Sequence, residues 1–300
     1  MRVHAVDHVS AELAECCRRL EVLAPGSGLA RSLSRMLGRL DRRLTRPPRV
    51  VLLGEFNTGK STIVNALIGR EVLPTSIHAN TRIPLLVHYS AQPSLMLECR
   101  DHVRHRFDDA AIALLRAGHG CMLHVGLPVD ILKSFELIDT PGLASGMLRP
   151  DEHVLNACRR AHVAIWCTSA TQAWKASEQA VWLGLPHRLK RQGLLVATQA
   201  DGLNTARDRE RLEARLRMET AGRFAGLAFL AAVEADEVRR APEQPDYAAR
   251  WEACGGGAFE AQLNGMLDRE MANREASARR VLARMAARLS PANLAVLHAA

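Results

Sequence analysis

The sequence predicts an α/β fold in which a mostly parallel sheet has helices on both faces, with a short helical bundle formed by the N- and C-terminal helices. Three observations predict it. Short apolar, β-branched runs alternate with helical stretches between residues 49 and 231. A glycine-containing loop follows the first of these runs. Amphipathic stretches lie before and after the alternating region.

The amphipathic stretches predict the helical bundle. In residues 3–23 and 29–44, apolar side chains recur every three or four positions, which is the period of a helix with one apolar face. Pro47 and Pro48 end the second stretch, because proline does not continue a helix. A third stretch, 259–289, has the same period. We expect these apolar faces to form a protein core rather than a membrane anchor.

The alternating region predicts the sheet and its covering helices. The predicted strands are 49–53, 83–89, 95–100, 135–138, 162–168, 194–198 and 227–231. The predicted helices between them are 60–69, 108–117, 151–160, 177–190 and 205–223. Segments rich in proline or glycine, 241–246 and 255–257, are typical breaks between elements.

Composition narrows the class of protein. Of 300 residues, 48% are apolar and 24% are charged, as in ordinary globular proteins. No apolar stretch is long enough to cross a bilayer, and residues 1–10 lack the apolar segment of a secretory signal. The seven cysteines lack the spacing of zinc ligands, so we expect reduced thiols and a cytoplasmic location.

The net charge of +8 suits an anionic partner. Only 4% of the residues are aromatic, too few to form platforms on which bases stack. We therefore expect no nucleic-acid partner and favour an anionic membrane surface, with the chain peripheral at the inner face of the membrane.

The strongest motif is a phosphate-binding loop directly after the first predicted strand. Its form is GxxxxGK(S/T), and it opens a predicted helix, which is the context that the motif requires. Glycines let successive N–H groups approach phosphate oxygens. Lys60 would lie between the β- and γ-phosphates, and Ser61 would ligate Mg²⁺. The predicted nucleotide-binding residues here are Gly54, Glu55, Phe56, Asn57, Thr58, Gly59, Lys60, Ser61 and Thr62.

A second motif, Asp-Thr-Pro-Gly, follows the predicted strand 135–138. Asp139 would hold the Mg²⁺ shell, through water, and the N–H group of Gly142 would meet a γ-phosphate and release it after cleavage. Between the two motifs, residues 73–84 form a predicted loop in which Thr75 and Thr81 are both candidates to reach Mg²⁺.

A third motif, Thr198-Gln199-Ala200-Asp201, ends another predicted strand. The Asp201 carboxylate would accept hydrogen bonds from N1–H and the 2-amino group of guanine, a donor pair that adenine lacks. The usual signature is (N/T)KxD, so Gln199 stands at the lysine position and covers the base less well. An Asp-Gly pair is also a plain turn, and this alternative stays open for Asp201 and Gly202.

At these four places the sequence resembles the dynamin superfamily, particularly its bacterial dynamin-like members, over roughly residues 45–235. The resemblance implies a P-loop GTPase fold, with Thr81 as the switch threonine and metal ligand beside Ser61 and Asp139. It also implies that Asn57 acts in catalysis with Lys60, Thr81 and Gly142. Leu143 stands where Ras-type GTPases have a glutamine that positions water.

The resemblance further implies that two GTPase domains pair across the nucleotide, as a homodimer or heterodimer, with Mg²⁺ and a monovalent cation such as K⁺. Basal turnover of GTP to GDP and phosphate would then be low and would rise on dimerisation. The expected division is N-terminal helices (1–46), a GTPase domain (47–245) and a C-terminal helix packing with the N-terminal helices (246–300).

Two other hypotheses remain open. The chain lacks the long helical stalk of membrane-polymerising dynamins, and it carries Leu143 and Gln199, which together favour a nucleotide-gated regulatory subunit of a larger dynamin-like partner. The basic charge also suits a ribosome-associated GTPase, but the sequence contains no recognisable RNA-binding appendix.

Overall fold

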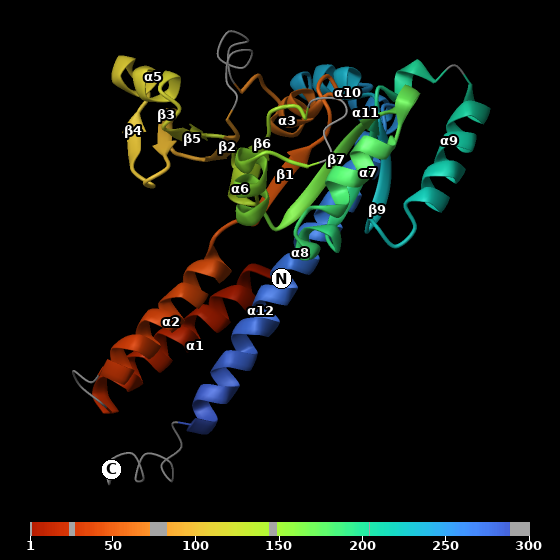
Figure 1. The fold of residues 1–300 in the computed structure, drawn as a ribbon. Coiled ribbons are helices and arrows are strands. Elements are labelled where there is room, and N and C mark those ends of the chain that lie inside the picture. The colour runs from red at the N-terminus through yellow and green to blue at the C-terminus, as the bar shows by residue number, and fades with distance from the viewer. Residues whose placement is uncertain (1, 24–27, 73–82, 144–148, 204, 289–300) are drawn as a thin grey trace. The chain divides into compact units, whose positions relative to one another are not determined.

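The structure is a computed structural model that describes residues 2–23, 28–72, 83–143, 149–203 and 205–288. The chain forms two compact units. The sheet unit comprises Pro48–Leu267, and the helical unit comprises Met1–Pro47 together with Asp268–Ala300. The predicted α/β fold with a mostly parallel sheet and helices on both faces is confirmed (Figure 1).

The sheet unit is built on nine strands in the order β4-β3-β5-β2-β6-β1-β7-β8-β9. The pairs from β6 through β1, β7 and β8 to β9 are parallel, as is β2 with β5. The pairs β2–β6, β3–β4 and β3–β5 are antiparallel. The strands are β1 (Arg49–Leu53), β2 (Leu85–Tyr89), β3 (Ser94–Cys99), β4 (Arg104–Arg106), β5 (Gly120–Leu127), β6 (Glu136–Asp139), β7 (Val163–Ser169), β8 (Gly193–Thr198) and β9 (Gly226–Leu230).

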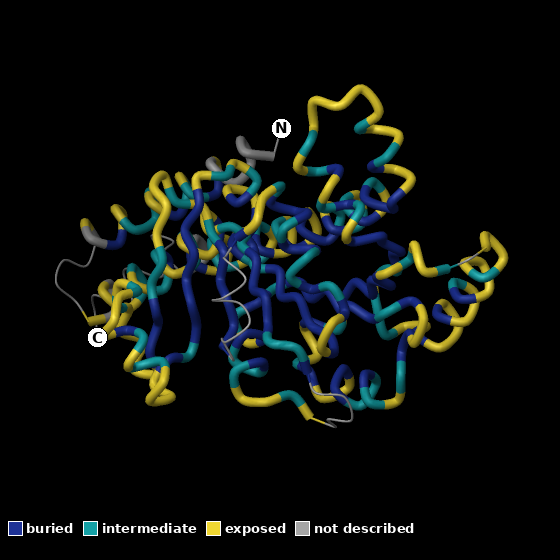
Figure 2. The backbone as a smooth tube through the Cα atoms, turned by 90° about the horizontal axis from the view of Figure 1, so that it is seen from above, coloured by how far each residue is buried: buried dark blue, intermediate teal, exposed yellow. Residues whose placement is uncertain are grey.

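Helices cover both faces of this sheet, as alternation along β1 illustrates. Val50 and Leu52 belong to one core cluster, and Val51 and Leu53 to another, because successive side chains of a strand point to opposite faces. Figure 2 shows buried backbone at the centre of the unit and exposed segments around it. The covering helices are α3 (Lys60–Ile68), α5 (Asp109–Arg116), α6 (Glu152–Arg160), α7 (Ala176–Leu183), α8 (His187–Lys190), α9 (Ala206–Glu219), α10 (Ala232–Arg240) and α11 (Tyr247–Ala253).

One face carries an aromatic cluster. The indole of Trp166 lies edge-on to those of Trp174 and Trp182, with ring centroids 6.2 Å and 5.8 Å apart. Phe224 stacks on Trp182 at 4.2 Å. These rings fill the space between β7, α7 and the segment before β9, so they fix where the loop after β7 leaves the sheet.

The helical unit contains α1 (Arg2–Leu23), α2 (Gly28–Thr45) and α12 (Gly256–Arg288) from residue 268 on. The apolar faces of the three helices form one core, with Leu13, Leu37 and Met285 among its buried members. Arg274 is buried on α12, pairs with Glu270 at 2.7 Å, and donates hydrogen bonds of 2.9 Å to the carbonyl oxygens of Arg43 and Arg46. This arginine therefore binds the carbonyl groups at the C-terminal end of α2.

The secondary structure differs from the prediction at several places. The predicted helix 177–190 is two helices, α7 and α8, because Pro186 interrupts it. Strands β4 and β5 and helices α10 and α11 were not predicted from the sequence. Glycine interrupts the apolar run of β5, and an added Cβ at Gly126 would lie 2.3 Å from Ser94 Oγ, so this close approach between strands requires glycine. Within the described residues, no helix has the length and apolar character needed to cross a membrane.

Candidate functional site

The loop between β1 and α3 has the backbone that the phosphate-binding motif requires. Gly54 has φ 147°, and an added Cβ there would lie 2.2 Å from the carbonyl oxygen of Cys167 on β7, so only glycine fits. Asn57 and Gly59 also have positive φ angles, 58° and 76°. These turns wrap the chain around the N-terminal end of α3, where anions are favoured.

Lys60 is buried at the first position of α3 and closes the loop on itself. Its Nζ donates hydrogen bonds to the carbonyl oxygens of Gly54 at 3.1 Å and Glu55 at 2.7 Å. Burial lowers the pKa of the Lys60 ammonium, while the nearby Cys167, Asp139 and Glu55 oppose that shift. A phosphate in this loop would give Lys60 a charged acceptor and would favour its protonated form.

Ser61 and Asp139 meet beside the loop, although they come from different elements. Ser61 Oγ donates to a carboxylate oxygen of Asp139 at 2.6 Å. Asp139 is brought there because β6 pairs in parallel with β1, which places it opposite Leu52. Thr140 Oγ1 donates to the Leu52 carbonyl oxygen at 2.6 Å and fixes the end of β6.

The two oxygen groups suit a small hard cation. Mg²⁺ prefers oxygen ligands and is usually held by one or two protein groups plus phosphate oxygens and water. Across the described residues there is no group of three or more His, Cys, Asp or Glu side chains that could hold a metal by itself. Ser61 and Asp139 therefore fit a metal whose remaining ligands come from a nucleotide and water.

The segment after β6 is bonded to the phosphate loop. Leu143 N donates to the Gly54 carbonyl oxygen and Phe56 N donates to the Leu143 carbonyl oxygen, both at 3.1 Å. An added Cβ on Gly142 would lie 2.7 Å from Phe56 Cα, so this close approach also requires glycine. The Leu143 side chain is buried, and an apolar, buried side chain does not orient water.

The motif after β8 lies against the same loop. Thr198 is fully buried, and its hydroxyl donates to the carbonyl oxygens of Thr58 at 2.9 Å and Thr168 at 3.1 Å. Gln199, with φ 55°, donates from Nε2 to the Asn57 carbonyl oxygen at 3.2 Å, and its Oε1 accepts from Ser169 Oγ at 2.5 Å. Thr198 and Gln199 thus hold neighbouring loops together.

Asp201 is exposed in the short 3₁₀ helix Ala200–Gly202. Its carboxylate is open to a ligand, unlike the side chain of Thr198. Thr75 and Thr81 lie outside the described residues. The remaining predicted site residues come together at the carboxyl ends of β1, β6 and β8, where parallel sheets bind their ligands.

Sequence reasoning missed the residues that hold Glu55. This second residue of the phosphate loop is buried, and its carboxylate accepts from Lys175 Nζ at 3.0 Å and Ser177 Oγ at 2.9 Å. The backbone N of Lys175 in turn donates to the buried Glu178 at 2.8 Å. The available signal was the segment after an apolar strand, residues 171–178, which contains Lys175, Ser177 and Glu178.

Glu178 also contacts the strand β7 that precedes this segment. Its carboxylate accepts from Trp166 Nε1 at 3.2 Å and from Thr168 Oγ1 at 2.9 Å. Burial raises the pKa of the Glu178 carboxyl, while these hydrogen bonds oppose the shift. The phosphate loop is therefore connected through Glu55, Lys175 and Glu178 to the aromatic cluster.

A glycine-rich loop closed by a buried lysine, with a serine and an aspartate side by side at the carboxyl ends of parallel strands, defines the P-loop class of nucleotide-binding proteins. Residues 50–193 match the model of the Dynamin family. Over these residues the chain is therefore similar to the dynamin superfamily, and in particular to a bacterial dynamin-like protein.

Three curated relatives are similar in sequence. "Dynamin-like protein 2" of Campylobacter jejuni is 25% identical over 203 residues, 66% of this chain and 33% of the relative. "Probable transmembrane GTPase FZO-like, chloroplastic" of Arabidopsis thaliana is 25% identical over 192 residues, 64% of this chain and 19% of the relative. "Isoniazid-induced protein IniC" of Mycobacterium tuberculosis is 32% identical over 116 residues, 36% of this chain and 24% of the relative.

The matched part of this chain thus spans a third or less of each of these relatives. Among solved structures, a bacterial dynamin described as an oligomerised pair that senses and tethers membranes has a TM-score of 0.54. The alignment covers 88% of this chain and 42% of that chain at 18% identity, so it shows a shared fold.

Proposed function

We propose that this chain binds GTP with Mg²⁺ and hydrolyses it to GDP and phosphate. The observation that carries the proposal is the junction of Lys60, Ser61 and Asp139 at the mouth of a loop shaped for phosphate. Such a junction supplies the charge, the metal ligand and the outer-shell carboxylate that phosphoryl transfer uses.

Each site residue has a proposed role. The backbone N–H groups of the loop and Lys60 hold the β- and γ-phosphates, Ser61 ligates Mg²⁺, and Asp139 holds the metal shell through water. Gly142 senses the γ-phosphate through its N–H group, and Thr81 completes the metal shell. The other proposed phosphate-loop residues are Gly54, Glu55, Phe56, Asn57, Thr58, Gly59 and Thr62.

For the base, we propose that Asp201 selects guanine and that Thr198 and Gln199 position the loops around it. The exposed carboxylate of Asp201 supports this role, and the hydrogen bond from Gln199 to the Asn57 carbonyl oxygen joins the base side to the phosphate side. A carboxylate rejects adenine because it would be left without its two donors.

Catalysis is proposed to rise when two GTPase domains pair, as a homodimer or heterodimer. The buried side chain of Leu143 supports this proposal, because no glutamine is available at that place to orient the attacking water. Asn57 and a K⁺ ion would then supply charge stabilisation. A second candidate, a regulatory subunit of a larger dynamin-like partner that hydrolyses little GTP itself, is favoured by the same Leu143 and by Gln199 at the usual lysine position.

We also propose a cytoplasmic location at the inner face of a membrane, and a functional division into residues 1–46, 47–245 and 246–300. The names of one relative and one solved structure support the location at a membrane. The relative is called a transmembrane GTPase, and the structure is described as tethering membranes.

The test is GTP turnover per molecule against protein concentration, in potassium buffer with Mg²⁺, with Lys60→Ala as blank. A rate per molecule that climbs with concentration supports hydrolysis activated by pairing. A flat rate near zero, with GTP still bound, contradicts it and supports the regulatory subunit. No binding of GTP contradicts both.

A further inference from the structure

One helix carries a straight row of unpaired arginines. Four arginines of α2, together with Arg46 directly after it, are spaced four, four, three and four residues apart. All five are exposed: Arg31, Arg35, Arg39, Arg42 and Arg46. The N–H group of Arg46 still donates to the Arg42 carbonyl oxygen at 3.2 Å, as in a continuing helix. At 3.6 residues per turn they fall within a sector of about 80° and extend over about 22 Å. We call this set the arginine row.

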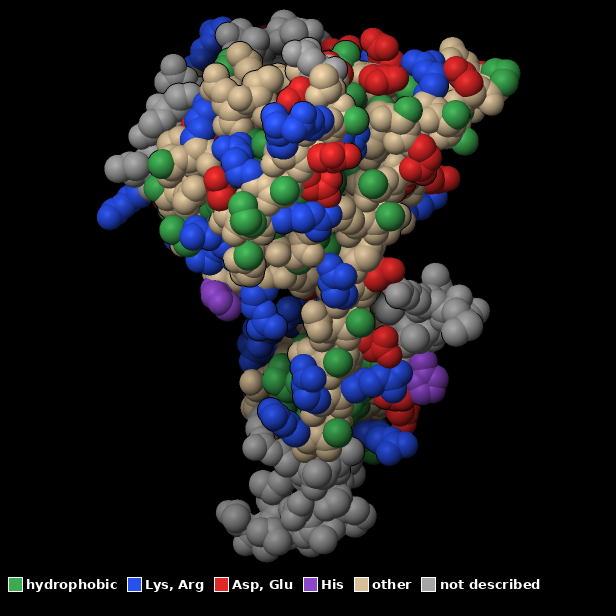
Figure 3. Space-filling view, turned by 90° about the vertical axis from the view of Figure 1, so that its right-hand side faces the viewer, with side chains coloured by type: hydrophobic (Ala, Val, Ile, Leu, Met, Phe, Trp, Pro, Cys, Tyr) green, Lys and Arg blue, Asp and Glu red, His purple; other side chains and the backbone are tan. Residues whose placement is uncertain are grey.

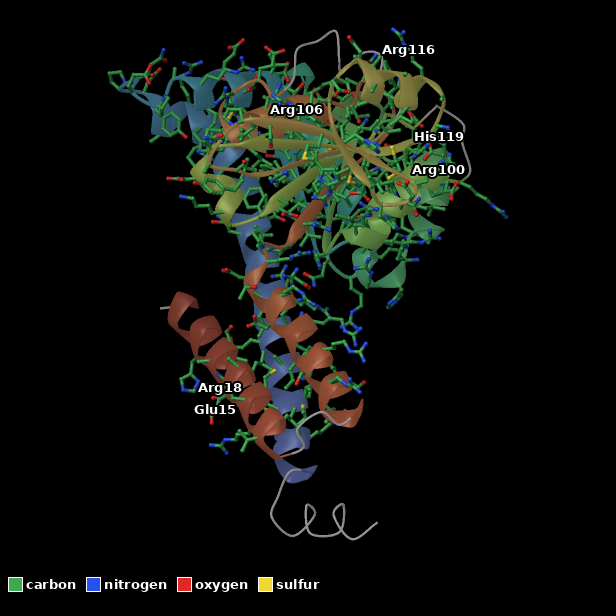
Figure 4. All side chains as sticks on the ribbon, turned by 90° about the vertical axis from the view of Figure 1, so that its left-hand side faces the viewer. Glu15, Arg18, Arg100, Arg106, Arg116 and His119 are labelled. Atoms are coloured by element: carbon green, nitrogen blue, oxygen red, sulfur yellow. The ribbon has the colours of Figure 1, made fainter. Side chains whose placement is uncertain are left out.

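Elsewhere on the helices, several exposed arginines are paired with an acid one turn away. Arg19 pairs with Glu15, Arg217 with Glu213 and Arg240 with Asp236. Figure 4 labels Arg18 and Glu15 of another such pair on α1. In the part of the chain that the structure describes, no member of the arginine row has an ion-pair partner, although α2 contains Asp41.

Asp41 does not neutralise the row. It accepts a hydrogen bond from Ser10 of α1, within the helical unit. By helical geometry it lies roughly a quarter of a turn or more outside the sector of the row. The opposite side of α2 contributes Leu37 and Leu44 to the core, so the helix is fixed with the row toward solvent.

The rest of the helical unit is also basic. Residues 1–47 and 268–300 contain 15 arginines against eight aspartates and glutamates, a net charge of +7 of the chain's +8. The sheet unit, with 220 of the 300 residues, accounts for the remaining +1. Figure 3 shows basic side chains recurring along the visible face of the helical unit.

The sheet unit also has a region with several basic side chains, but the net charge of that region is small. Figure 4 shows Arg100, Arg106, Arg116 and His119 near the edge of the sheet where β3 and β4 lie, together with helix α5. Three aspartates lie in the same stretch of sequence, Asp101, Asp108 and Asp109, so its net charge is small. Residues 31–46, which contain the arginine row, include six arginines against one acidic residue, Asp41.

We propose that the arginine row binds the phosphodiester headgroups of an anionic lipid bilayer. A second copy of the chain does not fit, because it presents the same +7 unit and would be repelled. A single-stranded nucleic acid fits poorly, because residues 1–47 and 268–300 contain no Phe, Trp or Tyr on which bases could stack. A flat sheet of phosphates matches a straight row on one side of a helix, and guanidinium groups bind phosphate in a bidentate manner.

The contact would be electrostatic and peripheral. No aromatic side chain in the unit can anchor at the membrane interface, and the apolar face of α2 is used in the core. Binding should therefore fall steeply with salt, since exposed charges are screened beyond about 10 Å at 0.1 M ionic strength. This inference deepens the proposed membrane role, but it rests on charges remote in sequence from the nucleotide site.

The test is flotation of the full chain with phosphatidylcholine vesicles that contain phosphatidylglycerol, against vesicles of phosphatidylcholine alone. Arg39→Gln/Arg42→Gln removes two charges from the row. Loss of one charge should lower the partition coefficient about fivefold, and loss of both charges should lower it roughly twenty-five-fold. Arg39→Lys/Arg42→Lys should retain most binding, because the charge remains.

The matched control is Arg207→Gln/Arg211→Gln, which removes two exposed arginines from α9 and gives the same net charge. It should bind vesicles as the wild type does. Three results would overturn the proposal. Both double variants could lose binding equally, or the wild type could bind equally well to vesicles without phosphatidylglycerol. The row variant could also lose binding to polyuridylate, a single-stranded RNA, while it still binds vesicles. Circular dichroism confirms that each variant is folded.

A third variant separates this proposal from the proposed nucleotide function. Lys60→Ala should bind anionic vesicles normally while losing GTP, and Arg39→Gln/Arg42→Gln should bind GTP normally while losing vesicles. A wild type that binds vesicles through the row but never binds GTP would contradict only the nucleotide function. A wild type that binds GTP but no vesicles would contradict only the arginine row.

Discussion

Ser61 Oγ lies 2.6 Å from a carboxylate oxygen of Asp139, although 78 residues separate them in the sequence. The parallel pairing of β1 with β6 brings the two together, and it sets the N-terminal end of α3 beside the end of β6. The hydroxyl and the carboxylate thus form the oxygen-rich side of the loop whose other side is Lys60.

Replacing Asp139 by asparagine should weaken the effect of Mg²⁺ on nucleotide binding. A carboxylate that orients metal-bound water contributes roughly ten- to a hundredfold to metal affinity. We expect the Mg²⁺ concentration that half-saturates GTP binding to rise by that factor, measured by titration of a fluorescent GTP analogue. Asp130→Asn, at an exposed site paired with Lys133, is the control and should leave the titration unchanged.

Lys60→Ala should weaken triphosphate binding by roughly a hundredfold, because it removes a charged hydrogen-bond donor from a buried site. The same fluorescent analogue reports the loss. Lys133→Ala removes an exposed lysine that pairs with Asp130 and should bind like the wild type. Full affinity in Lys60→Ala would show that the phosphates are held elsewhere.

Asp201→Asn should shift base preference from guanine toward xanthine, because the carboxylate acceptor becomes half donor. Competition between GTP and XTP should change by at least about a hundredfold. Asp208→Asn, on the neighbouring helix α9, is the control for a lost negative charge. If the base preference of Asp201→Asn is unchanged, Asp201 does not select the base, and the short helix Ala200–Gly202 is only a turn.

The sheet unit also contains a buried ion cluster at Glu98. Its carboxylate accepts from Arg160 at 2.6 Å and from His124 at 2.7 Å. Burial alone raises the pKa of the Glu98 carboxyl, but hydrogen bonds from Arg160, His124 and His102 outweigh it and lower the pKa to about 2. Burial lowers the pKa of His124 to about 4, against the opposing hydrogen bond with Glu98.

Both shifts make the fold less stable in acid. Between pH 6.5 and 4 the unfolded chain takes a proton on His124 that the folded chain does not, and between pH 4.5 and 2 the same holds for Glu98. The free energy of unfolding should therefore fall as the pH drops through these windows, as measured by urea unfolding at fixed pH.

Glu98→Gln should lower the free energy of unfolding at neutral pH by about 2 kcal/mol, because it leaves Arg160 without its buried partner. It should also remove the dependence between pH 4.5 and 2. Glu15→Gln breaks only the exposed pairs with Arg18 and Arg19 and should reproduce the wild-type curve. Identical curves for Glu98→Gln and the wild type would contradict the role of this cluster.

The sequence predicted the fold where local pattern and packing agree. Strands β1, β7 and β8 are continuous apolar runs because both faces are covered, and such runs are easy to recognise. Strand β5 was missed because Gly120, His124 and Gly126 interrupt its apolar run for reasons of tertiary contact, such as the ion cluster at Glu98. The resemblance to the dynamin superfamily is confirmed over residues 50–193.

The site was predicted as a set of motifs, but not as a network. The motifs alone predict where Lys60 and Asp139 lie, because Lys60 begins the helix after the phosphate loop and Asp139 stands at the end of a strand. It does not reveal that Glu55 is held by Lys175, since that contact joins residues 120 apart in sequence. The roles of Asn57, Thr81, Gly142 and Asp201 stay predictions until the variants are measured.

The tryptophans of this molecule lie in only one of its two units. All four tryptophans, Trp166, Trp174, Trp182 and Trp251, belong to the sheet unit, and none belongs to the helical unit. Intrinsic emission therefore reports the sheet unit alone, whereas far-ultraviolet dichroism is dominated by all helices together. Because Trp174 precedes Lys175, the partner of Glu55 in the phosphate loop, the same emission can also register a nucleotide entering that loop without any attached dye.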